Sequence, residues 1–338
     1  MKPAFLVRNS SRVYIGPVAE ILPDLLPEGR VVVVSDGTID RLYHPMLARY
    51  DAVLIGLGES VKTLQTVETL YRRFIELGVD RSTFVLAVGG GIVTDVAGFV
   101  ASTYMRGLKF GFVSTTLLGQ VDASVGGKNG VNVDGYKNMV GTFTQPQFVI
   151  CDPALLRTLP DREFRAGLAE VVKAAIIADE GLFARIEQTS FEALRGDTAL
   201  LAGIIESAIR IKADIVERDE REAGERRKLN LGHTLAHAIE KSSHRMNHGE
   251  AVAVGTALIA GAAVRLGLLR EEERQRIVDL LARLGFELTP PVEMKRLLKE
   301  IGKDKKSEAG ILHVVLPVAI GRCEVRNFSI EEFSALFA

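Results

Sequence analysis

The chain has 338 residues, of which 47% are apolar and 25% charged, and its formal net charge is −1. This composition is typical of a folded protein with a large core, and at this length two domains are expected. The near-zero net charge gives no electrostatic basis for binding nucleic acid or an anionic membrane. An anionic ligand would have to be held by a local cluster of cations.

Cysteine content and apolar runs bear on the cellular compartment. The two cysteines, Cys151 and Cys323, lie far apart and form no CxxC motif, which favours a reducing compartment without a disulfide framework. The N-terminal segment lacks the apolar core of a signal peptide. The longest apolar run, 251–264, is too short to span a bilayer and predicts a buried helix. We therefore expect a cytoplasmic protein with no membrane contact.

Over the first 150 residues, short β-branched runs alternate with helical stretches such as the amphipathic segment 61–78. This alternation predicts a Rossmann-like α/β domain with a parallel sheet covered on both faces. Ligands of such sheets bind beyond the carboxyl ends of the strands. The candidate strands are 31–36, 52–58, 84–91, 110–116 and 148–152.

The pattern changes between residues 152 and 160. From 161 to 300 apolar residues recur three and four apart, as in 200–220, and no long β-rich run appears before 311–317. We predict an α/β domain over 1–152 and a mainly α-helical domain over 153–338, with the active site in the cleft between them.

Two glycine-rich segments of the first domain are candidates for anion binding. In "AVGGGIVTDVAGFVAST" (87–103) a strand ends in three glycines and a helix follows, which suits a pyrophosphate or simply a tight turn without a ligand. The segment 114–141 is irregular and carries Lys128 and Lys137, each beside an Asn. These ammonium groups are candidates for binding phosphate or carboxylate, and the alternative is a pair of solvated surface lysines.

A cluster of histidines marks the second domain. Four of the six histidines, His233, His237, His244 and His248, fall within sixteen positions. His233 and His237 share a helical face, and Glu170 adds a carboxylate. Two imidazoles and one carboxylate suit a catalytic zinc ion with an open coordination position. The spacing does not tell which of His233, His237, His248 and Glu170 is not a ligand.

Two neighbouring segments supply further charged candidates. Glu170 and Lys173 share a helical face among apolar residues, either as a partly buried pair or as an ordinary surface ion pair. The charged run 211–230 is for the most part a solvated face. Its candidates Lys212, Arg226 and Asn230 are singled out because they lead into the histidine segment.

Seven segments, in order between about residues 57 and 322, closely resemble the 3-dehydroquinate synthase family of the sugar phosphate cyclases. They are "GGGIVTDVAGFVASTYMRG", "TTLLGQVDASVGGKNGVN", "KNMVGTFTQP", "LRTLPDREFRAGLAEVVK", "LNLGHTLAHAIE", "HGEAVAVG" and "DKKSEAGILHVVLPVAIG". Such an ordered series is far more specific than any one motif.

The resemblance implies an NAD-dependent lyase that uses Zn²⁺ or Co²⁺ and belongs to the shikimate pathway of chorismate and aromatic amino acid biosynthesis. Its small-molecule substrate would be 3-deoxy-D-arabino-heptulosonate 7-phosphate, and its products 3-dehydroquinate and phosphate. The reaction would proceed by transient oxidation, metal-assisted phosphate elimination, re-reduction and intramolecular aldol closure. Domain 1–152 would bind NAD, domain 153–338 would bind metal and substrate, and two chains would form a homodimer.

The resemblance also assigns residues. Glu170, His233 and His248 match the metal ligands, and His237 matches a proton-relay residue. The positions that match substrate contacts are Asp122, Lys128, Asn138, Lys173, Lys212, Arg226, Asn230, one of Lys305 and Lys306, and Arg106, which would reach the neighbouring subunit's site. The positions that match NAD contacts are Asp36, Glu59, Lys62, Gly90, Gly91, Asp95, Thr115, Thr116, Lys137 and Thr158.

The chain departs from the family pattern in places. Asn129 stands where Thr is usual, Tyr136 where Gly is usual, and the segment 238–247 is about two residues shorter. Other sugar phosphate cyclases, such as 2-deoxy-scyllo-inosose synthase or a valiolone-type synthase, are therefore the first alternative. A metal-dependent alcohol dehydrogenase of the glycerol dehydrogenase type is the second, and a sugar-phosphate binding protein is the third. The presence of Lys212, Arg226, Asn230 and His237 favours the dehydroquinate synthase assignment.

Overall fold

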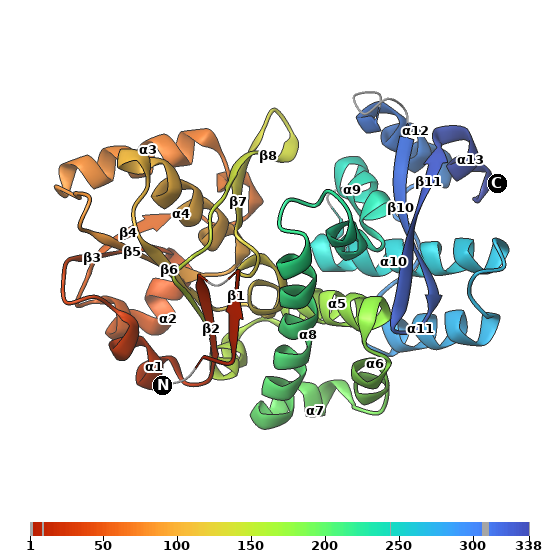
Figure 1. The fold of residues 1–338 in the computed structure, drawn as a ribbon, viewed down its shortest axis with the longest axis horizontal. Coiled ribbons are helices and arrows are strands. Elements are labelled where there is room, and N and C mark those ends of the chain that lie inside the picture. Colours follow the sequence, from red (N-terminus) through yellow and green to blue (C-terminus); the bar gives the residue numbers. More distant parts are fainter. Residues whose placement is uncertain (1–2, 9, 244, 306–310, 338) are drawn as a thin grey trace. The chain divides into compact units, whose positions relative to one another are not determined.

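The computed structural model describes residues 3–8, 10–243, 245–305 and 311–337. They form two compact units, Met1–Leu159 and Pro160–Ala338 (Figure 1). Among the described residues, helices are too short or too polar to cross a membrane.

Unit 1 is built on a seven-stranded sheet in the order β1-β2-β9-β6-β5-β3-β4, in which only the β1–β2 pair is antiparallel. The strands of unit 1 are β1 (Phe5–Val7), β2 (Ser11–Ile15), β3 (Val31–Asp36), β4 (Asp51–Ile55), β5 (Phe84–Gly89), β6 (Phe110–Ser114), β7 (Lys128–Val133), β8 (Tyr136–Phe143) and β9 (Phe148–Cys151). Its helices are α1 (Val18–Leu25), α2 (Gly37–Leu47), η1 (Glu59–Val61), α3 (Leu64–Glu76), α4 (Gly91–Thr103), η2 (Tyr104–Arg106), η3 (Gly119–Ala123) and η4 (Pro153–Thr158).

Helices cover both faces of this sheet, which explains why its central strands are apolar throughout. Helices α1 and α2 lie on one side and α3 and α4 on the other (Figure 1). Val31 to Val34 in β3 are all buried, and the rings of Phe84 and Phe148 stack with centroids 5.6 Å apart inside the α1–α2 layer. A parallel sheet with both faces buried requires such continuous apolar runs.

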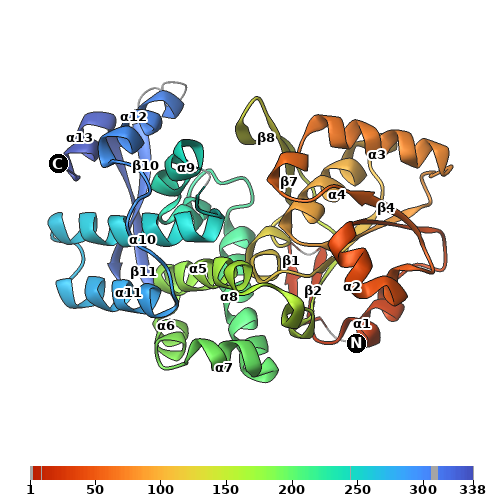
Figure 2. The ribbon, with the colours of Figure 1, turned by 180° about the vertical axis from the view of Figure 1, so that it is seen from behind.

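Unit 2 is mainly helical, with one two-stranded antiparallel sheet. Helix α10 packs against α5, α9 and α11, and its residues 251–264 are largely buried (Figure 2). The elements of unit 2 are α5 (Asp161–Ala178), α6 (Glu180–Glu187), α7 (Phe191–Gly196), α8 (Thr198–Arg218), η5 (Glu225–Asn230), α9 (His233–Ser242), α10 (His248–Arg265), α11 (Glu271–Arg283), α12 (Met294–Lys305), β10 (Ile311–Ala319), β11 (Arg322–Ser329) and α13 (Ile330–Ala335).

The predicted fold class is confirmed, and so are all five candidate strands and the helices within 61–78, 200–220 and 251–264. The segment 114–141 is more regular than expected, because its second half belongs to the hairpin β7–β8. Asp134 and Gly135, with φ of 50° and 80°, form its two-residue turn, and this conformation suits the twist of a hairpin. The N-terminal strands β1 and β2 were not predicted.

The stacked ring of Phe148 gives a test of the unit 1 core. We expect Phe148→Ala to lower the free energy of unfolding by about 3–5 kcal/mol, because a fully buried ring is replaced by a cavity. Ile75→Ala is the control, since Ile75 is 66% exposed and its loss should change stability by less than about 0.5 kcal/mol. Urea unfolding measures both, and equal midpoints would contradict this description of the core.

Candidate active site

Helix α5 carries a buried carboxylate, Glu170. Only 1% of the Glu170 side chain and 4% of the Lys173 side chain are exposed, and Lys173 Nζ lies 2.5 Å from Glu170 Oε2. The pair is therefore not an ordinary surface ion pair. A buried carboxylate needs cationic partners to stay ionised, and Lys173 supplies one of them.

Two imidazoles converge on the other oxygen of Glu170. His248 Nε2, at the start of α10, lies 3.2 Å from Glu170 Oε1, and His233 Nε2, at the start of α9, lies 3.8 Å from it. One ligand atom from each of the three side chains lies within 4.8 Å of the other two. Two imidazole nitrogens and one carboxylate oxygen at this separation form a set that a single divalent ion of the zinc type can use.

The two imidazoles differ in charge when no metal is bound. Burial, together with the nearby Lys173 ammonium, lowers the pKa of His233 to about 3, so this ring is neutral. Burial also acts to lower the pKa of His248, but hydrogen bonds with Glu170 and Glu240 outweigh it and raise the pKa to about 10. His248 therefore carries the positive charge that balances the buried carboxylates.

Close helix contacts bring the three side chains together. A Cβ on Gly249, the residue after His248, would lie 2.2 Å from Ala166 Cα in α5. A Cβ on Gly232, which precedes His233, would lie 2.8 Å from the backbone nitrogen of Thr256 in α10. Gly232 also has a φ of 77°, which favours glycine. Glycine at these two positions lets α10 approach both α5 and α9.

Contacts behind the imidazoles fix the direction of each ring. His233 Nδ1 lies 3.1 Å from the carbonyl oxygen of Leu231, and His248 Nδ1 lies 3.3 Å from Glu240 Oε1. Sequence reasoning did not single out Glu240. The available signal was its position seven residues after His233, which places both side chains on one face of a helix.

Other predicted residues of unit 2 lie on these elements or on their neighbours. The His237 ring centroid is 5.5 Å from that of His233 on the same helix. Lys212 is buried in α8 and Arg226 in η5, and both elements pack against α5. The Arg226 guanidinium donates to the Glu220 carbonyl, and Asn230 donates to Glu222. The side chain of Lys305 and all of Lys306 lie outside the described residues, as does His244.

Unit 1 places several of its predicted residues at the carboxyl ends of its strands. Gly90 and Gly91 follow β5 and begin α4, and a Cβ on Gly90 would lie 2.8 Å from Thr116 Cγ2. Lys62 is buried, and its Nζ lies 2.5 Å from both Asp95 Oδ2 and Asn138 Oδ1. The structure thus joins residues predicted for cofactor contact with one predicted for substrate contact.

Several predicted cofactor positions also have structural roles. Asp36 caps α2 by accepting hydrogen bonds from the amides of Thr38 and Ile39, and Thr158 shares a hydrogen bond with Tyr43. The Glu59 carboxylate accepts from Asn132, whose own side-chain oxygen accepts from the Asn138 amide. Asn132 was not among the predicted residues.

The remaining candidates of unit 1 are more exposed or lie elsewhere. Lys128 and Lys137 are exposed on β7 and β8, Asp122 is half-buried in η3, and Thr115 is buried after β6. Arg106 is exposed in η2 with a φ of 70°, and Met105 before it has a φ of 49°. These two successive residues with left-handed backbone conformation end the α-helical path of α4 and form the η2 turn.

The departures from the family pattern leave the metal-capable cluster intact. Asn129 is buried and donates to the carbonyl oxygens of Gly127 and Thr144, which closes the base of the hairpin. Tyr136 is 49% exposed beside the hairpin turn. The shorter segment after His237 still allows His248 to reach Glu170.

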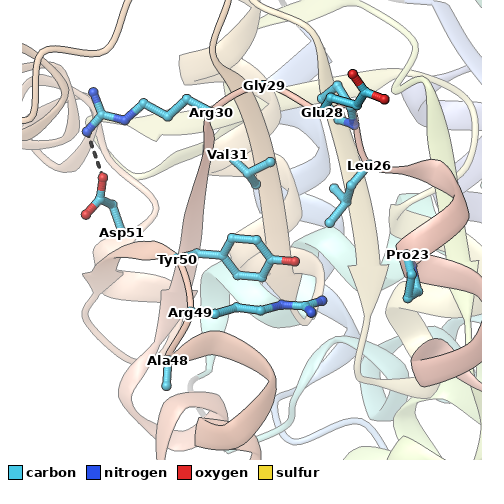
Figure 3. Close-up of a pocket in the computed structure, with 11 residues that line it drawn as sticks. Pro23, Leu26, Glu28, Gly29, Arg30, Val31, Ala48, Arg49, Tyr50 and Asp51 are labelled. Carbon is cyan, nitrogen blue, oxygen red and sulfur yellow. Dashed lines mark hydrogen bonds and ion pairs between the residues drawn. The ribbon is translucent and has the colours of Figure 1, made fainter.

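A hollow of about 760 Å³ lies at the amino ends of β3 and β4, where Arg30 and Asp51 form an ion pair of 2.7 Å (Figure 3). Ligands of parallel α/β sheets bind at the opposite, carboxyl ends. We therefore assign it no part in the candidate site.

The contact of Gly249 with α5 yields a prediction. Gly249→Ala should lower the free energy of unfolding by about 1–3 kcal/mol, because the new methyl group meets backbone that cannot move aside. Gly261→Ala on the same helix is the control, since its Cβ would meet only the end of the Arg265 side chain at 3.9 Å. The free energy of unfolding of the control should rise by about 0.5–1 kcal/mol, because alanine has a higher helix propensity than glycine. Denaturant unfolding of the two variants decides, and a stabilised Gly249→Ala would contradict the close approach.

Comparisons with known proteins identify the family of the chain. Residues 52–166 match a family model described as 3-dehydroquinate synthase N-terminal, and residues 167–307 match 3-dehydroquinate synthase C-terminal. A 3-dehydroquinate synthase of Pelotomaculum thermopropionicum is 44% identical over 95% of this chain and 91% of its own length.

Solved structures of sugar phosphate cyclases share the fold. A 2-epi-5-epi-valiolone synthase of Streptomyces hygroscopicus with NAD⁺ and Zn²⁺ bound has a TM-score of 0.88 at 31% identity, covering 97% of this chain and 96% of its own. A 2-deoxy-scyllo-inosose synthase complexed with carbaglucose-6-phosphate, NAD⁺ and Co²⁺ has a TM-score of 0.88 at 26% identity, covering 98% and 97%. The sequence matches over both halves, together with the shared fold, show that the chain is an enzyme that belongs to the 3-dehydroquinate synthase family.

Proposed function

We propose that this chain converts 3-deoxy-D-arabino-heptulosonate 7-phosphate into 3-dehydroquinate and phosphate, as a carbon–oxygen lyase that uses NAD and Zn²⁺ or Co²⁺. The observation that carries the proposal is the convergence of Glu170, His233 and His248 in a chain whose relatives bear this enzyme's name. Its place would be the shikimate pathway.

The donor set fits the proposed metal. His233 and His248 direct Nε2 toward Glu170, and both Nδ1 atoms have partners of their own. A set of two imidazoles and one carboxylate leaves a coordination position for substrate. The related valiolone synthase and inosose synthase hold Zn²⁺ and Co²⁺ respectively, which supports either ion here.

The turn after β5 fits the proposed NAD. Gly90 and Gly91 present backbone amides at the start of α4, where the helix dipole favours the charge of a pyrophosphate. Lys62 and Asp95 lie at the same end of the sheet. We assign the cofactor contacts to this region and to Asp36, Glu59, Thr115, Thr116, Lys137 and Thr158, as the family resemblance implies.

When bound, NAD would take up a hydride from a carbinol carbon and later return one, and the metal would stabilise the negative charge of a deprotonated hydroxyl oxygen. The chain's own residues would bind and orient the substrate. The cations Lys128, Lys173, Lys212 and Arg226 would neutralise its phosphate and carboxylate, with Asn138, Asn230 and Asp122 as polar contacts. His237, adjacent to His233, would pass a proton to or from the substrate.

The comparisons favour this substrate over those of other cyclases. Identity is 44% with a 3-dehydroquinate synthase, against 31% and 26% with the valiolone and inosose synthases. We also propose a homodimer in which Arg106 reaches the partner's site. A cytoplasmic location completes the proposal and is supported by two buried free thiols, Cys151 and Cys323.

A substrate panel tests the proposed reaction. Purified protein with NAD and Zn²⁺ or Co²⁺ is given the heptulosonate 7-phosphate, glucose 6-phosphate, sedoheptulose 7-phosphate or glycerol, and phosphate, carbocyclic product and NADH are measured. We expect phosphate and 3-dehydroquinate from the heptulosonate alone, with no net NADH. Turnover of only another sugar phosphate would replace the proposed substrate, and NADH accumulation with glycerol would indicate a dehydrogenase.

The metal role of His233 is tested separately. His233→Ala should lose tightly bound Zn²⁺ and phosphate release, because one of three ligands is removed. His44→Ala, which removes an exposed imidazole from α2, should keep both. Metal content after dialysis is measured together with activity. A metal-loaded, active His233→Ala would remove this residue from the ligand set.

A further inference from the structure

We propose that Glu240 is a positioning residue that holds the His248 ring in one tautomer and strengthens Nε2 as a donor. The proposal rests on the proposed metal role of Glu170, His233 and His248. Glu240 lies in α9, only 6% of its side chain is exposed, and its Oε1 is 3.3 Å from His248 Nδ1.

The geometry assigns the two nitrogens of His248 to different tasks. Nδ1 faces Glu240, while Nε2 faces Glu170 at 3.2 Å. A carboxylate accepts a hydrogen bond and cannot donate one. Metal binding requires the proton on the Glu170 side of His248 to leave, and the Glu240 carboxylate keeps the remaining ring proton on Nδ1. The lone pair of Nε2 is then free to act as a ligand, on the side where His233 Nε2 and Glu170 Oε1 converge.

The acceptor behind His233 is of another kind. His233 Nδ1 faces the backbone carbonyl oxygen of Leu231, two residues away, at 3.1 Å. That carbonyl fixes the tautomer but carries no net charge. The Glu240 carboxylate also fixes the tautomer, and in addition it carries a full negative charge. That charge beside Nδ1–H makes the opposite nitrogen, Nε2, more basic. The two rings therefore have matched orientation and unequal donor strength.

The burial of Glu240 supports a specific role for its contact with His248. A buried carboxylate costs free energy unless it is paired, and Glu240 is paired with the ring that begins α10. Glu240 follows His233 by seven residues, which is about two helical turns. One face of α9 thus supplies a ligand directly and orients a second ligand from another helix.

The affinity for Zn²⁺ alone, measured by competition with a chromophoric chelator, tests this role. We expect Glu240→Gln to weaken Zn²⁺ binding about 10-fold, because the amide oxygen still accepts from Nδ1–H but has lost the charge, and Glu240→Ala to weaken it about 100-fold, because the acceptor is gone. Glu206→Gln makes the same change on the exposed face of α8 and should leave the affinity unchanged. A purely structural role would lower thermal stability without this ordered loss of affinity.

The outcomes separate this role from the proposed function. If the wild-type chain fails to bind Zn²⁺, or His233→Ala binds it as tightly, the proposed metal site is wrong and this role falls with it. If wild type binds through His233 while both Glu240 variants bind equally well, only the role of Glu240 is overturned. A ¹⁵N NMR spectrum of the zinc-loaded wild type should place the His248 proton on Nδ1. A proton on Nε2 would overturn the role regardless of how the variants fold.

Discussion

The site of unit 2 depends on keeping a buried carboxylate ionised. With 1% of its side chain exposed, Glu170 has no access to bulk water, so its charge must be balanced by neighbours. Lys173 balances one oxygen from the same helix, and the imidazoles of α9 and α10 approach the other. The close contacts at Gly249 and Gly232 follow from this requirement, because bulkier residues would hold the helices apart.

Unit 1 contains a buried cation whose charge is balanced in a similar way. Lys62 is 6% exposed and is held by the Asp95 carboxylate and the Asn138 side-chain oxygen. Because both partners already hold the Lys62 ammonium, its side chain loses little further conformational entropy when a ligand binds. That entropy is lost during folding instead. In both units, therefore, the polar groups are oriented by the fold rather than by a ligand.

Much of this could be predicted from the sequence, because the underlying signals are local. Runs such as Val31–Val34 mark strands buried on both faces, and three-and-four spacing marks the helices of unit 2. Spacing alone could not decide which histidines approach Glu170, since that depends on how α5, α9 and α10 pack. The hairpin β7–β8 escaped prediction because its β8 strand is largely exposed and lacks a buried alternating face. Glu240 was not predicted, because a single acidic residue near the end of a helix is usually solvent-exposed.

The interior of α9 and the connection from α9 to α10 differ in how their lengths can vary. The described residues between Ser242 and His248, which are 243 and 245–247, lie outside any helix. A residue gained or lost among them changes only the connection between α9 and α10. Inside α9, one added residue between His233 and Glu240 would rotate the later side chain by about 100° around the helix axis. Glu240 would then point away from His248. Insertions and deletions should accordingly be tolerated in the connection between Ser242 and His248 and not in the interior of α9.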